Sequence, residues 1–422
     1  MKTIPSILTL AAIPGLLSAE VVDGNKGELV EPRVRPMTVA DIEGRKGRTV
    51  SRSIIAVPQD INPGFAPGLY AQLSQEEGNV FFSPYSITEA MAMVHSGAGG
   101  NTATEIANAL SIDGDQKTLA QRLLNQRRFL MAQANKDDNK LNIANALCVT
   151  GMAPEQAYQD LVRKQFQGEL FAGGLDKING WVKEKTEGKI EKILEELSPD
   201  SVCVLLNAVY FKGKWQTPFK SRMTHKAPFF KADGKEVKVD MMTREGGFRV
   251  LRDNGLTAVD LPYQTSSSMV LIQPDKAGGM EALEKRLNEG LLTDLGHRLS
   301  QSRMERAKLY LPKFKIATEY DLIPAMKELG VKDAFGFAKS DFKAMYAKSS
   351  IKIAQIKHKA TLEVDEAGSV AAAATAVEMV RKSAAIRPPA AQIRFDRPFL
   401  VLIREKTTGT NLFVGRINDP TK

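Results

Sequence analysis

The segment from Glu366 to Pro389 constrains what this chain can fold into more than any other part of the sequence. It joins a run of small residues to the basic pair Arg381-Lys382, and two prolines then end any regular structure. Taken alone, Ala371 to Lys382 would also suit a helix, because its alanines, glutamate and methionine have high helix propensity. As a strand, however, the segment would present one face without any charge. The residues of that face are Ser369, Ala371, Ala373, Thr375, Val377 and Met379.

An uncharged face can be buried in a β-sheet without leaving an unpaired ion. Between Ser369 and the basic pair the only charged residue is Glu378, which would point to the opposite side of the strand. This alternation favours a strand over a helix. A basic pair can be a solvated linker in many sequences, but after such a segment it indicates a bait for a protease.

The amino terminus has the pattern of a secretory signal. It combines Lys2, an apolar stretch from Ile4 to Leu17, and the small residues Ser18 and Ala19. The alternative, a membrane anchor, is disfavoured because the apolar run is short and broken by two prolines. We therefore expect residues 1–19 to be a signal peptide cleaved after Ala19. The mature protein is expected to be secreted or extracellular, periplasmic if its source is a Gram-negative bacterium, and not bound to a membrane.

Composition and charge exclude several classes of protein. The 422 residues are 43% apolar, which is ample for a core, and the formal net charge is +9. Arg122, Arg127 and Arg128 lie in a helical pattern and could form a weak polyanion site, although a solvated helix face is the simpler interpretation. The basic residues are otherwise scattered, which argues against nucleic-acid binding. The cysteines, Cys148 and Cys203, and the four histidines show no metal-ligand spacing, so we expect no metal and no cofactor.

The order of the patterns predicts an α+β fold. Residues 20–56 are polar and predicted to be a flexible extension. Helical patterns dominate from Gly64 to about Lys140, where SPYS (83–86) opens an apolar helix and GAGG (97–100) ends it. Strand patterns follow at 141–150 and 202–212, and short β-rich runs dominate afterwards. Helices early and strands late are typical of α+β proteins rather than doubly wound parallel folds.

Five segments resemble signatures of the serpin family, in the correct order. They are NVFFSPYSITEAMAMVHSGAGGNTATEI (79–106), LLNAVYFKGKWQTPF (205–219), HKATLEVDEAGSVAAAA (358–374), FDRPFLVLI (395–403) and LFVGRINDP (412–420). The resemblance implies one serpin domain over residues 57–420, with three β-sheets, about nine helices and an exposed reactive-centre loop at about 366–389. It also implies a monomeric inhibitor rather than an enzyme.

The same resemblance assigns the site residues. Lys382 would be the bait residue and the bond between Lys382 and Ser383 the one cleaved, with Arg381 as second choice. The hinge of the loop would comprise Glu366, Gly368, Ser369, Ala371, Ala372, Ala373, Ala374 and Thr375. A polar cluster where the main sheet opens would comprise Ser83, Ser86, Asn207 and His358, with Trp215 above it. A buried Trp or His could also serve packing alone.

The resemblance implies a mechanism with a covalent partner. Trypsin-like serine proteases carry an aspartate in the primary pocket, which a lysine complements. The protease would form an acyl-enzyme with Lys382, after which the freed strand would insert into the main sheet and trap the enzyme. Two rival functions are a non-inhibitory carrier or chaperone on the same scaffold and a hydrolase using Ser96 beside His95. The hydrolase is disfavoured because no G-x-S-x-G turn surrounds Ser96.

Two features leave structural questions open. The segment Phe166–Trp181 looks shorter than its serpin counterpart, which puts the edge strand and the start of the next helix in doubt. The resemblance places Cys148 and Cys203 on neighbouring strands of the main sheet. Whether they form a disulfide depends on geometry that the sequence does not give.

Overall fold

The computed structural model describes residues 64–149, 153–197, 203–348, 350–369 and 389–422. All of them belong to one compact unit, Ala56–Lys422. The predicted signal peptide (1–19) and polar extension (20–56) lie outside the described residues and stay predictions. The same holds for residues 370–388 of the loop.

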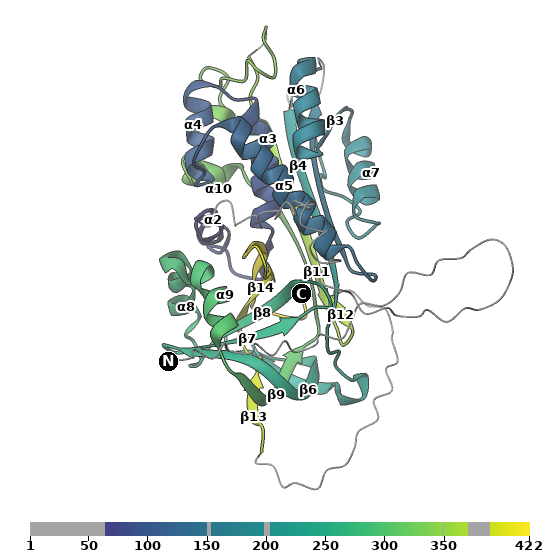
Figure 1. Cartoon of the computed structure of the whole chain (residues 1–422), viewed down its shortest axis with the longest axis vertical. Helices are drawn as coiled ribbons and strands as arrows, with labels where there is room; N and C mark the ends of the chain where they lie inside the picture. Colours follow the sequence, from purple (N-terminus) through teal and green to yellow (C-terminus); the bar gives the residue numbers. More distant parts are fainter. Residues whose placement is uncertain (1–63, 150–152, 198–202, 349, 370–388) are drawn as a thin grey trace, which may run out of the picture. The chain divides into compact units, whose positions relative to one another are not determined.

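The main sheet has six strands in the order β10-β11-β12-β4-β2-β3 (Figure 1). Their bounds are β10 (Phe314–Asp321), β11 (Gln355–Val364), β12 (Gly368–Ser369), β4 (Cys203–Lys214), β2 (Lys140–Val149) and β3 (Glu169–Ala172). β11 and β4 run parallel and pair directly from Gln355 opposite Val204 to Thr361 opposite Tyr210. β4 and β2 pair antiparallel over the whole of β2, from Lys140 opposite Lys212 to Val149 opposite Cys203.

The other described strands form one nine-stranded sheet, in the order β1-β15-β14-β8-β7-β6-β9-β13 with β5 beside β6. Their bounds are β1 (Val80–Phe82), β5 (His225–Phe230), β6 (Glu236–Asp253), β7 (Leu256–Pro262), β8 (Ser267–Pro274), β9 (Met304–Pro312), β13 (Ala391–Arg394), β14 (Phe399–Glu405) and β15 (Asn411–Ile417). The long strand β6 belongs to two groups, since its first part pairs with β5 and β9 and its last part with β7. The described strands therefore form two sheets rather than the three predicted, because β6 joins strands on both of its sides into one continuous sheet.

Nine α-helices occur in the described residues, in line with the predicted α+β fold. They are α2 (Phe65–Leu73), α3 (Pro84–Ser96), α4 (Gly100–Ala109), α5 (Gln116–Ala134), α6 (Gln156–Leu161), α7 (Leu175–Lys185), α8 (Met280–Arg286), α9 (Leu292–Gln301) and α10 (Ile323–Glu328). The predicted helix after SPYS forms as α3: the Ser83 hydroxyl caps it by accepting a hydrogen bond from Ser86 N, and Pro84 occupies the first turn.

The main sheet separates two apolar clusters. β11 alternates strictly between half-buried and buried residues, and its buried side chains join the large core that also contains α3. On the other face, α7 covers β2 and β4 with Ile178, Trp181 and Val182. α3 and α7 thus lie on opposite faces of the main sheet (Figure 1).

The segment 166–181 forms both elements that its shortness put in doubt. β3 pairs in parallel with the end of β2, from Glu169 opposite Ala146 to Ala172 opposite Val149. α7 begins at Leu175. The main sheet therefore keeps its edge strand.

Candidate functional site

The first residues of the predicted hinge already lie inside the main sheet. β12 sits between β11 and β4, where Ser369 pairs with Val364 on one side and with Gly213 on the other. Ser369 is fully buried, and its hydroxyl lies 2.7 Å from the hydroxyl of Tyr263. The loop therefore enters the gap where β11 and β4 no longer pair with each other.

A tight turn brings the chain from β11 into this gap. The Asp365 carboxylate accepts hydrogen bonds from Ala367 N at 2.8 Å and from Gly368 N at 3.1 Å. Gly368 has φ +158°, and a Cβ built on it would lie 2.0 Å from the carbonyl oxygen of Gly213. Glycine at position 368 is thus required by the close approach of β4.

Glu366 fixes the base of the hinge. Its carboxylate lies 2.9 Å from Lys313 Nζ and accepts a hydrogen bond from Thr224 Oγ1 at 2.7 Å. Burial opposes ionisation of Glu366, but the bonds from Lys313 and Thr224 outweigh it and hold the pKa of the carboxyl below its usual value. The carboxylate is therefore charged at neutral pH and ties the turn to Lys313, just before β10, and to Thr224, just before β5.

Trp215 lies beside the hinge, at the end of β4. Its indole Nε1 donates to the carbonyl of Asp365 at 2.9 Å, and its ring stacks on Tyr263 with centroids 4.7 Å apart. The hydroxyl of Tyr263 is in turn hydrogen-bonded to the Ser369 hydroxyl. The aromatic pair therefore forms the wall against which the first inserted residue packs.

The structure brings the four predicted polar residues together beneath the central strands. Ser83 N donates to His358 Nε2 at 3.2 Å, and the other ring nitrogen of His358 bonds the side-chain oxygen of Asn207. The Asn207 amide donates to the carbonyl of Ser86 at 3.0 Å and to its hydroxyl. All four residues are buried. The cluster links α3 to β4 and β11, the two strands on either side of the gap.

Three further residues extend this cluster and were missed in the sequence. Glu89 of α3 forms an ion pair with Arg127 of α5, and both side chains are buried. The Asn145 amide of β2 donates to Glu89 at 3.2 Å and its oxygen accepts from Asn207. Arg127 also donates to the carbonyl of Ile143 at 2.6 Å. The network thus continues from β4 to β2 and α5.

The predicted anion patch on α5 is wrong in one member. Arg127 is buried and paired with Glu89, whereas Arg122 and Arg128 are exposed. The spacing could have shown this, because Arg127 lies four residues after Leu123 and three before Leu130, both buried on the core-facing side of the helix. Helical position, rather than charge, decides where this arginine lies.

His358 must be neutral to keep its contacts. Nε2 accepts from Ser83 N, so the proton sits on Nδ1 and faces the Asn207 oxygen. Burial lowers the pKa of His358 from 6.5 to about 3. Below pH 6.5 the unfolded chain therefore binds a proton that the folded protein does not bind until about pH 3. The stability that the neutral ring contributes is complete above pH 6.5 and falls as the pH is lowered towards 3.

We expect His358→Gln to weaken this pH dependence. Glutamine keeps a donor and an acceptor but does not titrate. The measurement is the melting temperature of the uncleaved protein from pH 7.5 to pH 4, for parent and variant. The difference in melting temperature between the parent and the variant should shrink as the pH falls. If both melting temperatures changed equally with pH, His358 would not be the titrating group.

The two cysteines do not form a disulfide. Cys148 lies opposite Val204, and Cys203 lies opposite Val149. Since paired residues share a face and successive residues alternate, the two thiols point to opposite faces of the sheet. Cys148 packs in the cluster under α7 and Cys203 in the large core. Both are free, and burial raises the pKa of Cys203 to about 12.

The bait residues Lys382, Ser383 and Arg381 lie outside the described residues, as do positions 371 to 375 of the hinge. Their assignment remains a prediction. In the rival hydrolase interpretation, Ser96 would need a base, but its hydroxyl donates to the carbonyl of Ala92 at 2.8 Å within α3. This bond is the ordinary one for a helical serine.

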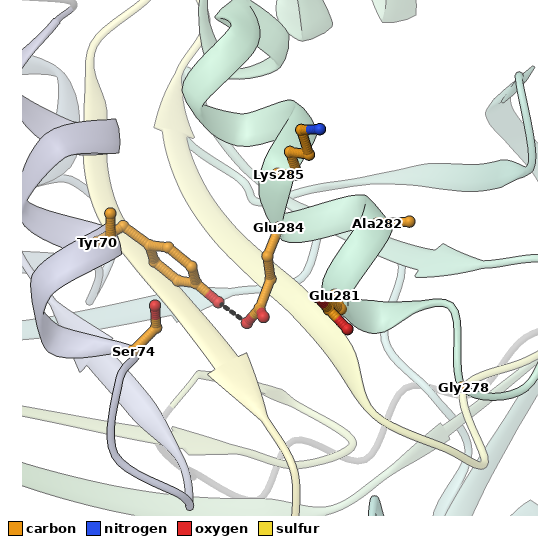
Figure 2. Close-up of a pocket in the computed structure, with 8 residues that line it drawn as sticks. Tyr70, Ser74, Gly278, Glu281, Ala282, Glu284 and Lys285 are labelled. Carbon is orange, nitrogen blue, oxygen red and sulfur yellow. Dashed lines mark hydrogen bonds between the residues drawn. The ribbon is translucent and has the colours of Figure 1, made fainter.

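A surface hollow of about 630 Å³ lies between α2 and α8 (Figure 2). Figure 2 shows Tyr70 pointing across it at Glu284, 2.6 Å from the carboxylate. Glu284 also receives Arg416 Nη1 at 2.8 Å. The Glu284 carboxylate in the hollow is thus already bonded to Tyr70 and Arg416 of the protein itself.

Within the described residues, no group of three histidine, cysteine or acidic side chains is arranged to hold a metal ion. Among the described helices, none combines the length and apolar content needed to cross a membrane.

Comparison with known proteins agrees with this fold. The family profile described as Serpin (serine protease inhibitor) matches residues 60–420. The chain is 35% identical over 375 residues to serine proteinase inhibitor 2.4 of Apodemus sylvaticus, covering 85% of this chain and 88% of the relative. It is 34% identical over 371 residues to human serpin B11, covering 81% and 93%. The chain therefore belongs to the serpin family.

Solved structures show the same fold. Human thyroxine-binding globulin in complex with thyroxine aligns with a TM-score of 0.78 at 26% identity, covering 86% of this chain and 98% of the globulin. Tengpin, a thermophilic serpin solved in its native state, aligns with a TM-score of 0.76 at 25% identity, covering 88% and 95%. The fold thus occurs both in a solved protein named as a protease inhibitor, mouse protein-Z dependent protease inhibitor, and in one named for binding thyroxine.

Proposed function

We propose that this chain is a suicide inhibitor of trypsin-like serine proteases, which traps the acyl-enzyme by inserting its cleaved loop into the main sheet. The observation that supports this most is Ser369, which is buried between β11 and β4 and pairs with both. The gap between the two strands has already begun to accept the loop, in a definite register.

The register can be continued along the loop. Ser369 lies opposite Gly213 and Val364, and β12 runs antiparallel to both β4 and β11. A strand continuing in this register places position 375 opposite Asn207 and His358, because each lies as far before Gly213 or Val364 as 375 lies after 369. The small uncharged face would then point into the core, like Ser369. The Thr375 hydroxyl would then lie beside the side chains of Asn207 and His358, whose mutual hydrogen bond insertion would break.

The reaction at the bait bond follows ordinary acyl transfer. The protease serine oxygen attacks the carbonyl carbon of Lys382, the bond to Ser383 breaks, and the new amino terminus of Ser383 leaves with a proton supplied by the protease histidine. Lys382 is then held as an ester on the protease. The inhibitor supplies the bait and the strand but no catalytic group.

The driving force is sufficient to disturb a folded enzyme. A strand inserted between β4 and β11 exchanges one ladder of backbone hydrogen bonds for two. About ten additional bonds at roughly 1 kcal/mol each, with burial of small side chains, give on the order of 10 kcal/mol. This is comparable with the stability of a whole domain. Insertion of a serpin loop into its main sheet is an established example of strand addition.

The alternative is a non-inhibitory carrier on the same scaffold. The hollow beside α2 and α8 does not favour it, because Glu284 is held by Tyr70 and Arg416. The uncharged residues after Ser369 favour inhibition, since a carrier has no need of a face that can be buried. Heating separates the two, because a loop that inserts after cleavage raises the unfolding temperature and one that stays outside does not.

Export of the mature chain, starting at Glu20, is part of the proposal because inhibition would then act on proteases outside the cell. The amino-terminal pattern described above supports it. Polyanion binding is left out of the proposal, since burial of Arg127 removes the central member of the basic patch.

The deciding experiment is incubation of the full-length secreted protein with trypsin, followed by denaturing electrophoresis and intact-mass measurement. We expect a stable adduct of inhibitor and trypsin together with a released peptide that begins at Ser383. The mass would also report processing after Ala19. Complete cleavage without an adduct, and without a gain in heat resistance, would refute the proposed trap.

A further inference from the structure

The polar network ties a single helix to both sides of the gap in the main sheet. On one side, Ser83 at the start of α3 holds His358 of β11 at 3.2 Å. On the other side, Ser86 of α3 holds Asn207 of β4 through its carbonyl at 3.0 Å. α3 thus bridges the two strands between which the loop would insert.

On the side of the gap formed by β4 and β2, the strands are also bonded to a buried ion pair, Glu89–Arg127. Asn145 of β2, which pairs with Asn207 in the strand register, donates to Glu89 of α3 at 3.2 Å. Arg127 of α5 pairs with Glu89 and reaches the β2 carbonyl of Ile143 at 2.6 Å. Tyr85 donates to the second oxygen of Glu89 at 2.7 Å. β2 is therefore fastened to two helices by a buried ion pair.

These contacts cannot all survive insertion. Neighbouring strands lie about 4.8 Å apart, so a new strand moves β4 and β11 apart by about that distance. A hydrogen bond is lost after a stretch of well under 1 Å. Because α3 holds both strands, widening the gap must release either the His358 contact or the contacts of β4 and β2 with the helices.

We propose that Glu89 and Arg127 act as a lock that holds β2 and β4 on α3 and α5 and so sets how readily the main sheet opens. The inference rests on the proposed function, since it concerns the step in which the loop inserts. Bonds to charged groups are stronger than neutral ones, and here both charges are buried, where they resist separation. Glu89 and Arg127 are positioning residues, because they act on the strands and touch neither the loop nor the protease.

The test uses a variant in which both charges are removed, Glu89→Gln with Arg127→Met. Removing one partner would leave an uncompensated buried charge and could prevent folding, whereas neutralising both is often tolerated. The probe is a synthetic peptide with the sequence of residues 370–380, mixed with uncleaved protein. Uptake is followed by native electrophoresis and by the rise in melting temperature.

A matched control removes another ion pair, which is partly buried, by Glu284→Gln with Arg416→Met. The side chains of Arg416 and Glu284 are 8% and 21% exposed, against 9% and 2% for Arg127 and Glu89. The control pair joins α8 to β15, and the hydrogen bonds that Arg416 donates go to Glu284 and to carbonyls of residues 74–78, outside the main sheet. It measures what the loss of a buried pair does to the fold in general.

We expect the Glu89/Arg127 variant to take up peptide at least about fivefold faster than the parent, and the control variant to match the parent. The melting temperature of the uncleaved Glu89/Arg127 variant should fall, while that of its cleaved form should stay within about 2 °C of the cleaved parent. Unchanged uptake, or an equal loss in both forms, would overturn the lock and leave the proposed function intact. A parent that takes up no peptide and gains no heat resistance on cleavage would overturn the proposed function, and the lock with it.

Discussion

Thr375→Arg is expected to convert the inhibitor into a substrate that trypsin cleaves and releases. If the inserted loop continued the register of β12, position 375 would lie on the core side, opposite Asn207 and His358. A guanidinium buried there without a partner costs several kcal/mol, and each 1.4 kcal/mol is a factor of ten. We expect the fraction of trypsin held as covalent adduct to fall at least about tenfold, measured by titrating trypsin activity against inhibitor.

The control for this variant is Val370→Arg. In the same continued register, position 370 would lie on the outer side, opposite the half-buried residues Lys212 and Glu363. Its guanidinium would lie near the Glu363 carboxylate and remain hydrated, so the adduct should form nearly as in the parent. If Thr375→Arg trapped trypsin as well as Val370→Arg, the assigned core face would be wrong.

Lys382→Leu is expected to reduce the rate of trypsin inhibition by about 100-fold. Truncating one partner of a buried charge pair typically costs 2–5 kcal/mol, and the trypsin pocket aspartate would lose its partner. The same variant should inhibit proteases with apolar pockets better than the parent does. The measurement is the second-order rate of inhibition of trypsin and of a chymotrypsin-like enzyme.

Arg381→Ala is the matched variant for the bait assignment. If Lys382 is the bait, Arg381→Ala leaves trypsin inhibition within a few-fold of the parent and the released peptide still begins at Ser383. Unchanged inhibition by Lys382→Leu, with a peptide beginning at Lys382 in the parent, would place the bait one residue earlier.

Local patterns in the sequence predicted much of the fold. Ser83 and Pro84 begin α3 as expected, since a capping hydroxyl followed by proline is a strong start signal. β2 and β4 also form within a few residues of their predicted bounds. These elements follow from side chains close together in the sequence.

The parts that could not be predicted depend on contacts between distant segments. The buried position of Ser369 depends on Tyr263 and on the close approach of Gly213 and Gly368. No periodicity contains that information. The faces of Cys148 and Cys203 required the register of β2 on β4, which a resemblance to neighbouring strands does not supply.

The burial of Arg127, in contrast, could have been predicted from the sequence. The three arginines of this helix share a charge, but the spacing from Leu123 places Arg127 among the buried leucines. The partner Glu89 likewise lies in a stretch of α3 that is buried throughout. Two opposite charges on two buried helix faces predict an ion pair when helical position is considered first.

The two residues of β12 have a consequence for the order of events. If the loop inserts as proposed, each further residue would pair after the one before it, so the ladder of hydrogen bonds would lengthen from Ser369 onwards. Insertion would then be sequential. A side chain that cannot be buried would stop it, and the number of residues inserted would be set by the distance of that side chain from Ser369. Variants that each carry one arginine on the core face would therefore stop insertion at different positions. The melting temperature of the cleaved variants should rise as the arginine is placed further from the hinge.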